Sequence, residues 1–238
     1  MSRARYPARA AAAREIALVC RRLYERGLIA GPDGNVSVRL GPDRVLVTPA
    51  GLSKVDLTPR DLVEVALDGA PRGRAPAGRR ASTEVGMHLR IYARRPDAMA
   101  VVHAHPPTAT AFAVAGEGLP DQVLPELIFL LGTVPLVPYA TPGTPALADG
   151  LEPFLGEHDA FLLANHGATT LGPTLRVAHQ RMESLEHGAR ILMAARHLGR
   201  VNQLADEHVR FLVDARRRLA GGDEPPGTGP KGRRRTTE

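Results

Sequence analysis

The sequence is short of cysteine and of aromatic residues, and each shortage excludes a class of protein. Cys20 is the only cysteine among 238 residues, so the chain can form no intrachain disulfide and no thiolate cluster for metal. Aromatic residues make up 4% and tryptophan is absent. Too few rings are therefore available for the stacking platforms that bind single-stranded nucleic acid.

Long hydrophobic runs and lysine are also scarce. No window approaches the roughly 18 apolar residues of a membrane span, and the N-terminus lacks the apolar core of a secretory signal, so we expect a cytoplasmic protein without a membrane partner. The net charge is +6, but only two of the 31 basic residues are lysine. An arginine bias explains this charge better than binding to nucleic acid does, and no nucleic-acid partner is predicted.

The hydrophobic content of 43% is ordinary for a packed fold, and the length suits one domain. We expect this domain to span residues 1–220. The proline, glycine and charged residues of 221–238 cannot bury a core, so this tail is predicted to be disordered.

Periodicity predicts an alternation of helices and strands. An amphipathic helix at 8–27 precedes a hairpin of strands at 36–40 and 44–48 and a third strand at 62–67. Further helices are expected at 82–95, 106–116, 145–155, 173–198 and 203–219, with strands at 98–105, 134–139 and 160–164. The remainder after 164 is expected to be helical. The predicted fold class is a single α/β domain with a mainly antiparallel central sheet flanked by helices.

Three histidines are candidate metal ligands. His103 and His105 lie two apart on a predicted strand, so both imidazoles project from one face. His166 follows the strand at 160–164, and Gly167 after it allows close backbone approach. Three histidines leave the fourth position of tetrahedral zinc open, as in catalytic sites. The pattern predicts one divalent ion, zinc, per chain.

Glu84 is the candidate acid/base beside these histidines. It lies at the predicted start of the helix at 82–95, where amides and nearby arginines would lower its pKa, whereas burial would raise it. The sequence leaves this balance open. His88 lies four residues later on the same helical face, and we expect it to pack against the sheet or to support the ligands.

Several turns could hold a phosphate group. Glycines and short hydroxyls occur at 34–37 and 48–51, and Ser82 and Thr83 precede the same helix as Glu84. Arginines gather in sequence around Glu84 and could steer an anionic substrate. They are Arg72, Arg74, Arg79, Arg80, Arg90, Arg94 and Arg95.

Taken in order, six motifs resemble the class II aldolase/adducin family, over roughly residues 10–200, and most closely its L-fuculose-phosphate aldolases. The motifs are Gly34-Asn-Val-Ser37, Thr48-Pro-Ala-Gly51, Ser82-Thr-Glu84, His103-Ala-His105, Pro138-Tyr-Ala-Thr-Pro-Gly-Thr144 and Asn165-His-Gly167.

The resemblance implies a zinc-dependent aldolase that cleaves a ketose 1-phosphate, such as L-fuculose 1-phosphate, into dihydroxyacetone phosphate and an aldehyde. It implies zinc on His103, His105 and His166, with Glu84 beside the ion as acid/base. It further implies a homotetramer with the site near a subunit interface. The positions that it matches to phosphate binding are Gly34, Asn35, Gly51, Ser82 and Thr83.

Two departures from the fuculose enzymes leave the substrate open. Ala50 replaces a hydroxyl residue of the phosphate loop, and the segment 124–131 lacks the tyrosine that protonates the aldehyde oxygen. Glu126 and Tyr139 are the remaining candidates for this role, and each has an equally good structural explanation. Apart from Lys231 of the tail, Lys54 is the only lysine, which disfavours an imine-forming mechanism.

Other functions stay open beside the aldolase. A ribulose-phosphate 4-epimerase or a methylthioribulose 1-phosphate dehydratase would use a similar metal site on the same scaffold. The epimerase fits less well, because Ile128 stands near the position where epimerases carry an acid. A non-catalytic adducin-like module conflicts with the four site residues, and a metallo-hydrolase would need an acid after His105 that the chain lacks.

Overall fold

A computed structural model describes residues 6–73, 75, 76 and 78–221. The centre of its fold is a seven-stranded sheet. The strand order is β3-β2-β1-β4-β7-β6-β5, and every neighbouring pair is antiparallel except β5 with β6. The strands are β1 (Asn35–Gly41), β2 (Arg44–Val47), β3 (Val63–Val65), β4 (Ala100–Ala104), β5 (Leu136–Val137), β6 (Ala160–Leu163) and β7 (Gly167–Gly172).

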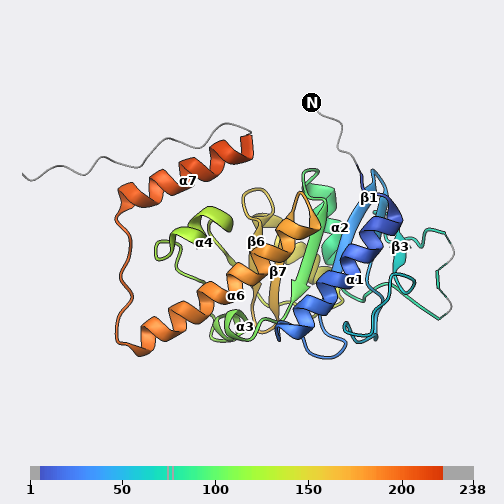
Figure 1. Ribbon diagram of the computed structural model, residues 1–238, viewed down its shortest axis with the longest axis horizontal. Coiled ribbons are helices and arrows are strands. Elements are labelled where there is room, and N and C mark those ends of the chain that lie inside the picture. The colour runs from blue at the N-terminus through green and yellow to red at the C-terminus, as the bar shows by residue number, and fades with distance from the viewer. Residues whose placement is uncertain (1–5, 74, 77, 222–238) are drawn as a thin grey trace, which may run out of the picture.

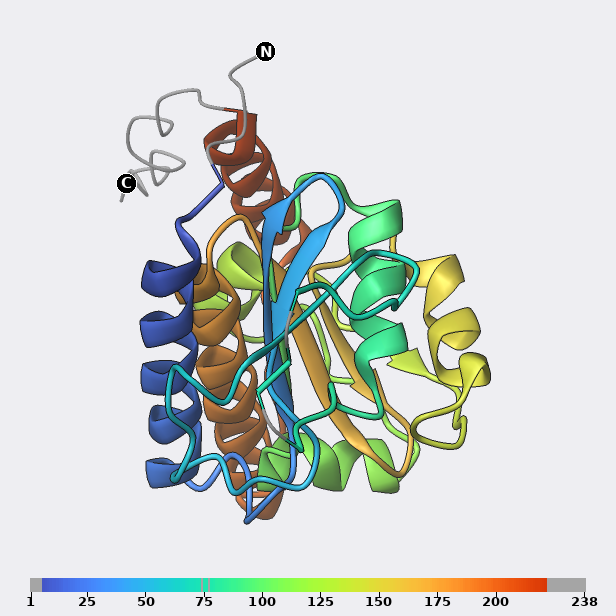
Figure 2. The same cartoon turned by 90° about the vertical axis from the view of Figure 1, so that its right-hand side faces the viewer.

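Helices cover both faces of this sheet (Figures 1 and 2). On one face lie α1 (Arg9–Glu25), α3 (Pro107–Val114), α4 (Pro125–Leu130) and α6 (Leu175–His197). On the other face lie α2 (Val85–Arg94) and α5 (Pro145–Leu151), the latter followed by a short 3-10 helix, Glu152–Phe154. The last described helix, α7 (Asp206–Gly221), packs against α4. The predicted α/β fold class with a mainly antiparallel sheet is confirmed.

Alternate residues of the central strands face opposite sides of the sheet, and the polar residues of β1 and β4 face the side of α2. On β1, Val36 and Val38 enter the apolar core under α1 and α6. Ser37 instead forms hydrogen bonds with side chains of α2. The same alternation on β4 sends Val102 to the α6 side, while His103 points to the opposite side with Val101. The site therefore forms on the α2 face of the sheet.

Two elements differ from the sequence-based expectation. The segment 167–172 was expected to be helical with the rest of the C-terminal part, but it is strand β7, between β4 and β6. Its six residues are all buried, so no polar alternation reveals it. Helix α4 was assigned no element in the sequence, because six residues are too few for a helical period.

Helix α2 begins later than predicted. The expected hydroxyl cap would have placed Glu84 in the first turn, but the first helical residue is Val85 and Glu84 is the residue before it. The hydroxyl oxygen of Ser82 accepts a hydrogen bond from the amide of Glu84 at 3.3 Å, which forms a turn ahead of the helix. Glu84 therefore lies on the loop that leads into α2.

Three further points concern Cys20, the tail and membrane spans. Cys20 is buried in α1, as predicted. The tail 222–238 lies outside the described residues. Within the described part of the chain, no helix is long and apolar enough to cross a membrane.

Candidate active site

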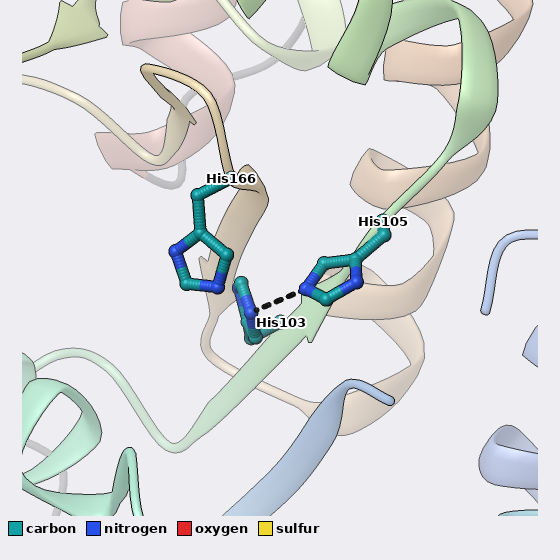
Figure 3. A group of neighbouring side chains, drawn as sticks. All are labelled: His103, His105 and His166. Atoms are coloured by element: carbon teal, nitrogen blue, oxygen red, sulfur yellow. Dashed lines mark hydrogen bonds between the residues drawn. The ribbon is translucent and has the colours of Figure 1, made fainter. Parts of the chain in front are cut away.

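Three imidazole rings converge at one end of the sheet (Figure 3). The Nε2 atoms of His103 and His105 are 3.2 Å apart, and one nitrogen from each of His103, His105 and His166 lies within 4.8 Å of the others. His103 is fully buried, while His105 and His166 are partly exposed. The structure thus brings together the three histidines that the sequence indicated as ligands.

The backbone of β4 and β7 sets this convergence. His103 of β4 faces Thr169 of β7 in this antiparallel pair. The chain enters β7 from β6 through a turn that carries Asn165 and His166. Asn165 has φ of 54°, in the left-handed region that asparagine tolerates better than most residues. A Cβ at Gly167 would lie 2.6 Å from both the Ala104 carbonyl oxygen and a ring carbon of His105. Only glycine lets the His166 turn approach β4 this closely.

A hydrogen bond fixes the orientation of His103. Its Nδ1 lies 3.0 Å from the carbonyl oxygen of Ala168 and 3.1 Å from the hydroxyl of Thr169. Because a carbonyl oxygen only accepts, Nδ1 carries the proton, and the lone pair of Nε2 faces the other two histidines. This arrangement is typical of histidine ligands, whose second nitrogen is held by a backbone carbonyl or a carboxylate.

The donor set fits a divalent ion. Zinc bonds of about 2.0–2.1 Å in a tetrahedron separate nitrogen ligands by about 3.3 Å, close to the distance between His103 and His105. Burial lowers the pKa of His103 to about 3 and also lowers the pKa of His105. Both imidazoles are therefore neutral near pH 7, as metal ligands must be. His103, His105 and His166 are the residues that could hold such an ion.

Glu84 lies against the same group. Its two carboxylate oxygens are 3.1 Å from His166 Nε2 and 3.4 Å from His103 Nε2, and Asn35 donates a 2.8 Å hydrogen bond to it. Burial raises the pKa of Glu84, but the hydrogen-bonding contact with His166, the nearby His103 and the Asn35 bond outweigh burial. The net effect is a pKa well below the ordinary value, which resolves the balance that the sequence left open.

A cleft of about 400 Å³ opens beside Glu84 and two of the histidines. It contains all five residues that the resemblance matched to phosphate binding, together with Ala50 and Lys54. Its lining is Pro32, Asp33, Gly34, Asn35, Pro49, Ala50, Gly51, Lys54, Ser82, Thr83, Glu84, His105, Pro142 and His166. Six separate segments of the chain thus surround one space next to the candidate metal ligands.

Lys54 is a residue of this cleft that the sequence analysis did not assign to the site. Its ammonium donates to the carbonyl oxygens of Pro32 at 2.6 Å and Leu52 at 3.1 Å, and its amide donates to Gly31. It therefore ties together the two turns that carry Gly34 and Gly51. Burial lowers the pKa of Lys54, and no carboxylate within the described chain forms an ion pair with it. Its position inside the glycine turns was the signal that could have identified it.

Two other candidates lie elsewhere. Glu126 was a candidate with two interpretations, a site acid or an acid at a helix start, and it is exposed in the first turn of α4, where it lines a separate cleft with Arg26 and His187. Tyr139 is 58% exposed after β5 and does not line the 400 Å³ cleft. Within one described chain, neither residue is brought to the histidines.

The arginines around Glu84 in sequence do not form one steering patch. Most of them are held by acids away from the cleft: Arg72 pairs with Asp43, and Arg79 with Asp61. The remaining pairs are Arg90 with Asp149 and Glu152, Arg94 with Glu152, and Arg95 with Asp97 and Asp159. Arg74 lies outside the described residues. Proximity in sequence was misleading because these side chains leave different elements.

The fold and the site define a class: an α/β protein with three converging histidines beside a carboxylate and a cleft. Comparison with known proteins identifies the family. Residues 14–193 match the model of the class II aldolase and adducin N-terminal domain. The chain belongs to this family, and the predicted resemblance is confirmed.

Similar proteins in this family include enzymes that cleave carbon–carbon bonds. The 3-oxo-tetronate 4-phosphate decarboxylase of Escherichia coli K12 is 34% identical over 204 residues, which cover 84% of this chain and 90% of the relative. The L-fuculose phosphate aldolase of Methanococcus maripaludis is 34% identical over 177 residues, which cover 74% and 93%. These relatives support the prediction that the chain is a lyase-type enzyme.

A solved structure agrees with the fold. L-fuculose-1-phosphate aldolase from Thermus thermophilus superimposes with a TM-score of 0.68 at 36% identity, covering 81% of this chain and 96% of that chain. Most of the chain, rather than one motif, therefore shares this fold.

The position of Lys54 generates a first prediction. We expect Lys54→Met to raise the inhibition constant of inorganic phosphate about 10- to 100-fold, since a charge-assisted hydrogen bond contributes about 1.5–3 kcal/mol. The KM for a phosphorylated substrate should rise with it while kcat changes little. Steady-state kinetics with phosphate as competitor provides the measurement. A kcat lowered by a thousandfold in the variant, together with borohydride trapping of substrate on the wild-type protein but not on Lys54→Met, would instead indicate an imine at Lys54.

Proposed function

We propose that the chain is a zinc-dependent lyase that decarboxylates a phosphorylated 3-oxo sugar acid. The observation that carries this proposal is one partly buried carboxylate, Glu84, held against the histidines. Asp33, the other carboxylate of the cleft, is exposed, and no tyrosine lines the cleft within the described chain. The similarity to the 3-oxo-tetronate 4-phosphate decarboxylase over most of both chains supports the same choice.

Proton transfer separates decarboxylation from aldol cleavage. When a 3-oxo acid loses carbon dioxide, the bond to the carboxylate breaks and its electron pair moves toward the ketone, so no base is needed. One proton must then be added to the carbon. Aldol cleavage also requires removal of a hydroxyl proton from the departing aldehyde, which calls for a second group. Within the described cleft, Glu84 is the one partly buried carboxylate that could serve as such a group.

The residues of the site have defined tasks in this scheme. A divalent ion on His103, His105 and His166 would supply Lewis-acid stabilisation of the negative charge that develops on the ketone oxygen. Glu84, which its low pKa keeps ionised, would take a proton from water and pass it to the carbon, with Asn35 fixing its orientation. The turns at Gly34 and Gly51, together with Ser82, Thr83 and Lys54, would bind the phosphate.

Aldol cleavage of a ketose 1-phosphate such as L-fuculose 1-phosphate is the second candidate. It is favoured by the likeness to the Thermus thermophilus aldolase and by the chemistry, because both reactions leave the same carbanion next to a phosphorylated ketone. In that case a group such as Tyr139 or Glu126 would have to reach the cleft in the assembled protein. The homotetramer and the cytoplasmic location stay predictions.

A substrate panel tests the choice between the two reactions. Zinc-loaded protein should convert the phosphorylated 3-oxo acid to carbon dioxide and dihydroxyacetone phosphate, with kcat/KM at least about 100-fold above that for ketose 1-phosphates. Product masses identify each reaction, and a reaction without protein corrects for spontaneous decarboxylation. Release of an aldehyde without carbon dioxide as the faster reaction would contradict the proposal and favour the aldolase.

The role of Glu84 gives another prediction. In Glu84→Gln we expect zinc to be retained and kcat to fall about 10²- to 10⁴-fold, the usual effect of losing a positioned acid/base. Glu117→Gln removes an exposed carboxylate that pairs with Arg196 and serves as the matched control, with unchanged kinetics. Wild-type kcat in Glu84→Gln would remove this residue from the mechanism.

A further inference from the structure

A continuous row of buried polar side chains joins β1 to α2 behind the cleft. Asn35 donates to Glu84 at 2.8 Å; Ser37 lies 2.7 Å from His88 Nδ1 and 2.8 Å from the hydroxyl of Tyr92. Arg39 donates to the backbone carbonyl of Tyr92, and its guanidinium lies 5.0 Å from the centre of that ring. We call this row the β1–α2 ladder; its members are Asn35, Ser37, Arg39, Glu84, His88 and Tyr92.

The ladder matches the repeat of a strand to the repeat of a helix. Its β1 members are alternate residues, about 6.8 Å apart along the strand. Its α2 members, His88 and Tyr92, are four residues apart, about 6.0 Å along the helix, and Glu84 lies four residues before His88, just ahead of the helix. Each strand residue therefore meets a helix residue at nearly the same height. The ladder extends from Glu84 at the cleft along the length of α2.

Because these contacts are buried, losing one of them costs free energy. Ser37 and His88 are fully buried, Tyr92 is 1% exposed, and the neighbouring residues of α2, such as Met87 and Ile91, pack in an apolar cluster. An apolar contact between α2 and β1 would tolerate sliding or rolling of the helix. Buried polar groups do not, because a shift would leave each of them without its partner.

The ladder therefore sets where Glu84 points. Glu84 is the residue just before α2, so its direction depends on how α2 is placed against the sheet. Asn35 on β1 lies directly opposite His103 on β4. We propose that Ser37, Arg39, His88 and Tyr92 are positioning residues, which hold α2 in the one register that aims Glu84 at the histidines. Only the effect on rate rests on the function proposed above.

A double-mutant cycle tests this role. Ser37→Ala and Tyr92→Phe, each of which removes one hydroxyl, are made in the wild-type and the Glu84→Gln backgrounds. We expect each to lower kcat about tenfold in the wild type, at little change in KM, and to have no further effect after Glu84→Gln, because both act through Glu84. Thr170→Val removes a buried hydroxyl of β7 that bonds Ala178 outside the ladder, and controls for lost stability.

Equal losses in the two backgrounds, or the same loss in Thr170→Val, would overturn the proposal, since a purely structural role does not depend on Glu84. If either Ser37→Ala or Tyr92→Phe does not fold, the other variant alone completes the test.

A measurement of zinc affinity tests the same proposal without any substrate. The carboxylate of Glu84 lies 3.1 and 3.4 Å from two ligand nitrogens, so its displacement should weaken zinc binding. Competition with a chromophoric chelator should show about three- to tenfold weaker binding in Ser37→Ala, and no difference between Glu84→Gln with and without Ser37→Ala. Unchanged affinity in Ser37→Ala would count against the ladder. If no substrate of the panel is converted, the proposed function fails, while this arm still decides the proposal.

Discussion

The pairing of β4 with its neighbours is the interaction on which the site depends. His103 is flanked directly by Asn35 of β1 and by Thr169 of β7, so three polar side chains form one row across the sheet. Antiparallel pairing with β7 also places the Ala168 carbonyl at His103 and brings His166 back to the end of β4. A shift of one residue in this register would turn His103 into the apolar core under α6.

The two faces of the sheet serve different purposes. The face under α1 and α6 is an apolar core, which together with a smaller apolar cluster under α2 supplies the hydrophobic stabilisation of the domain. The face under α2 carries polar groups that are costly to bury, and it is there that the histidines, Glu84 and the cleft occur. Stability on one face thus supports a polar site on the other. The turns that Lys54 ties together line the cleft beside that site.

Local patterns predicted much of this arrangement. Two histidines on alternate positions of a strand share a face whatever the tertiary structure, so His103 and His105 could be paired from sequence alone. The ordered motifs added His166, Glu84 and the phosphate turns. Strand β7 was not predicted, because burial on both faces removes the alternation that identifies strands. Lys54 and the β1–α2 ladder were also missed, since they depend on which buried residues meet across elements. The sequence left Glu126 with two interpretations, a site acid or an acid at a helix start, because apolar neighbours in sequence do not show which way a helical side chain points; it lies exposed in the first turn of α4.

Metal dependence is the central claim of this account, and restoration of metal tests it most directly. Purified protein is stripped with a chelator, its zinc content is measured by mass spectrometry, and lyase activity is followed as zinc is returned. We expect activity to rise in proportion to bound zinc up to about one ion per chain, and His103→Ala to regain neither the ion nor the activity. Full activity in the stripped protein, or a fully active His103→Ala without zinc, would contradict the account.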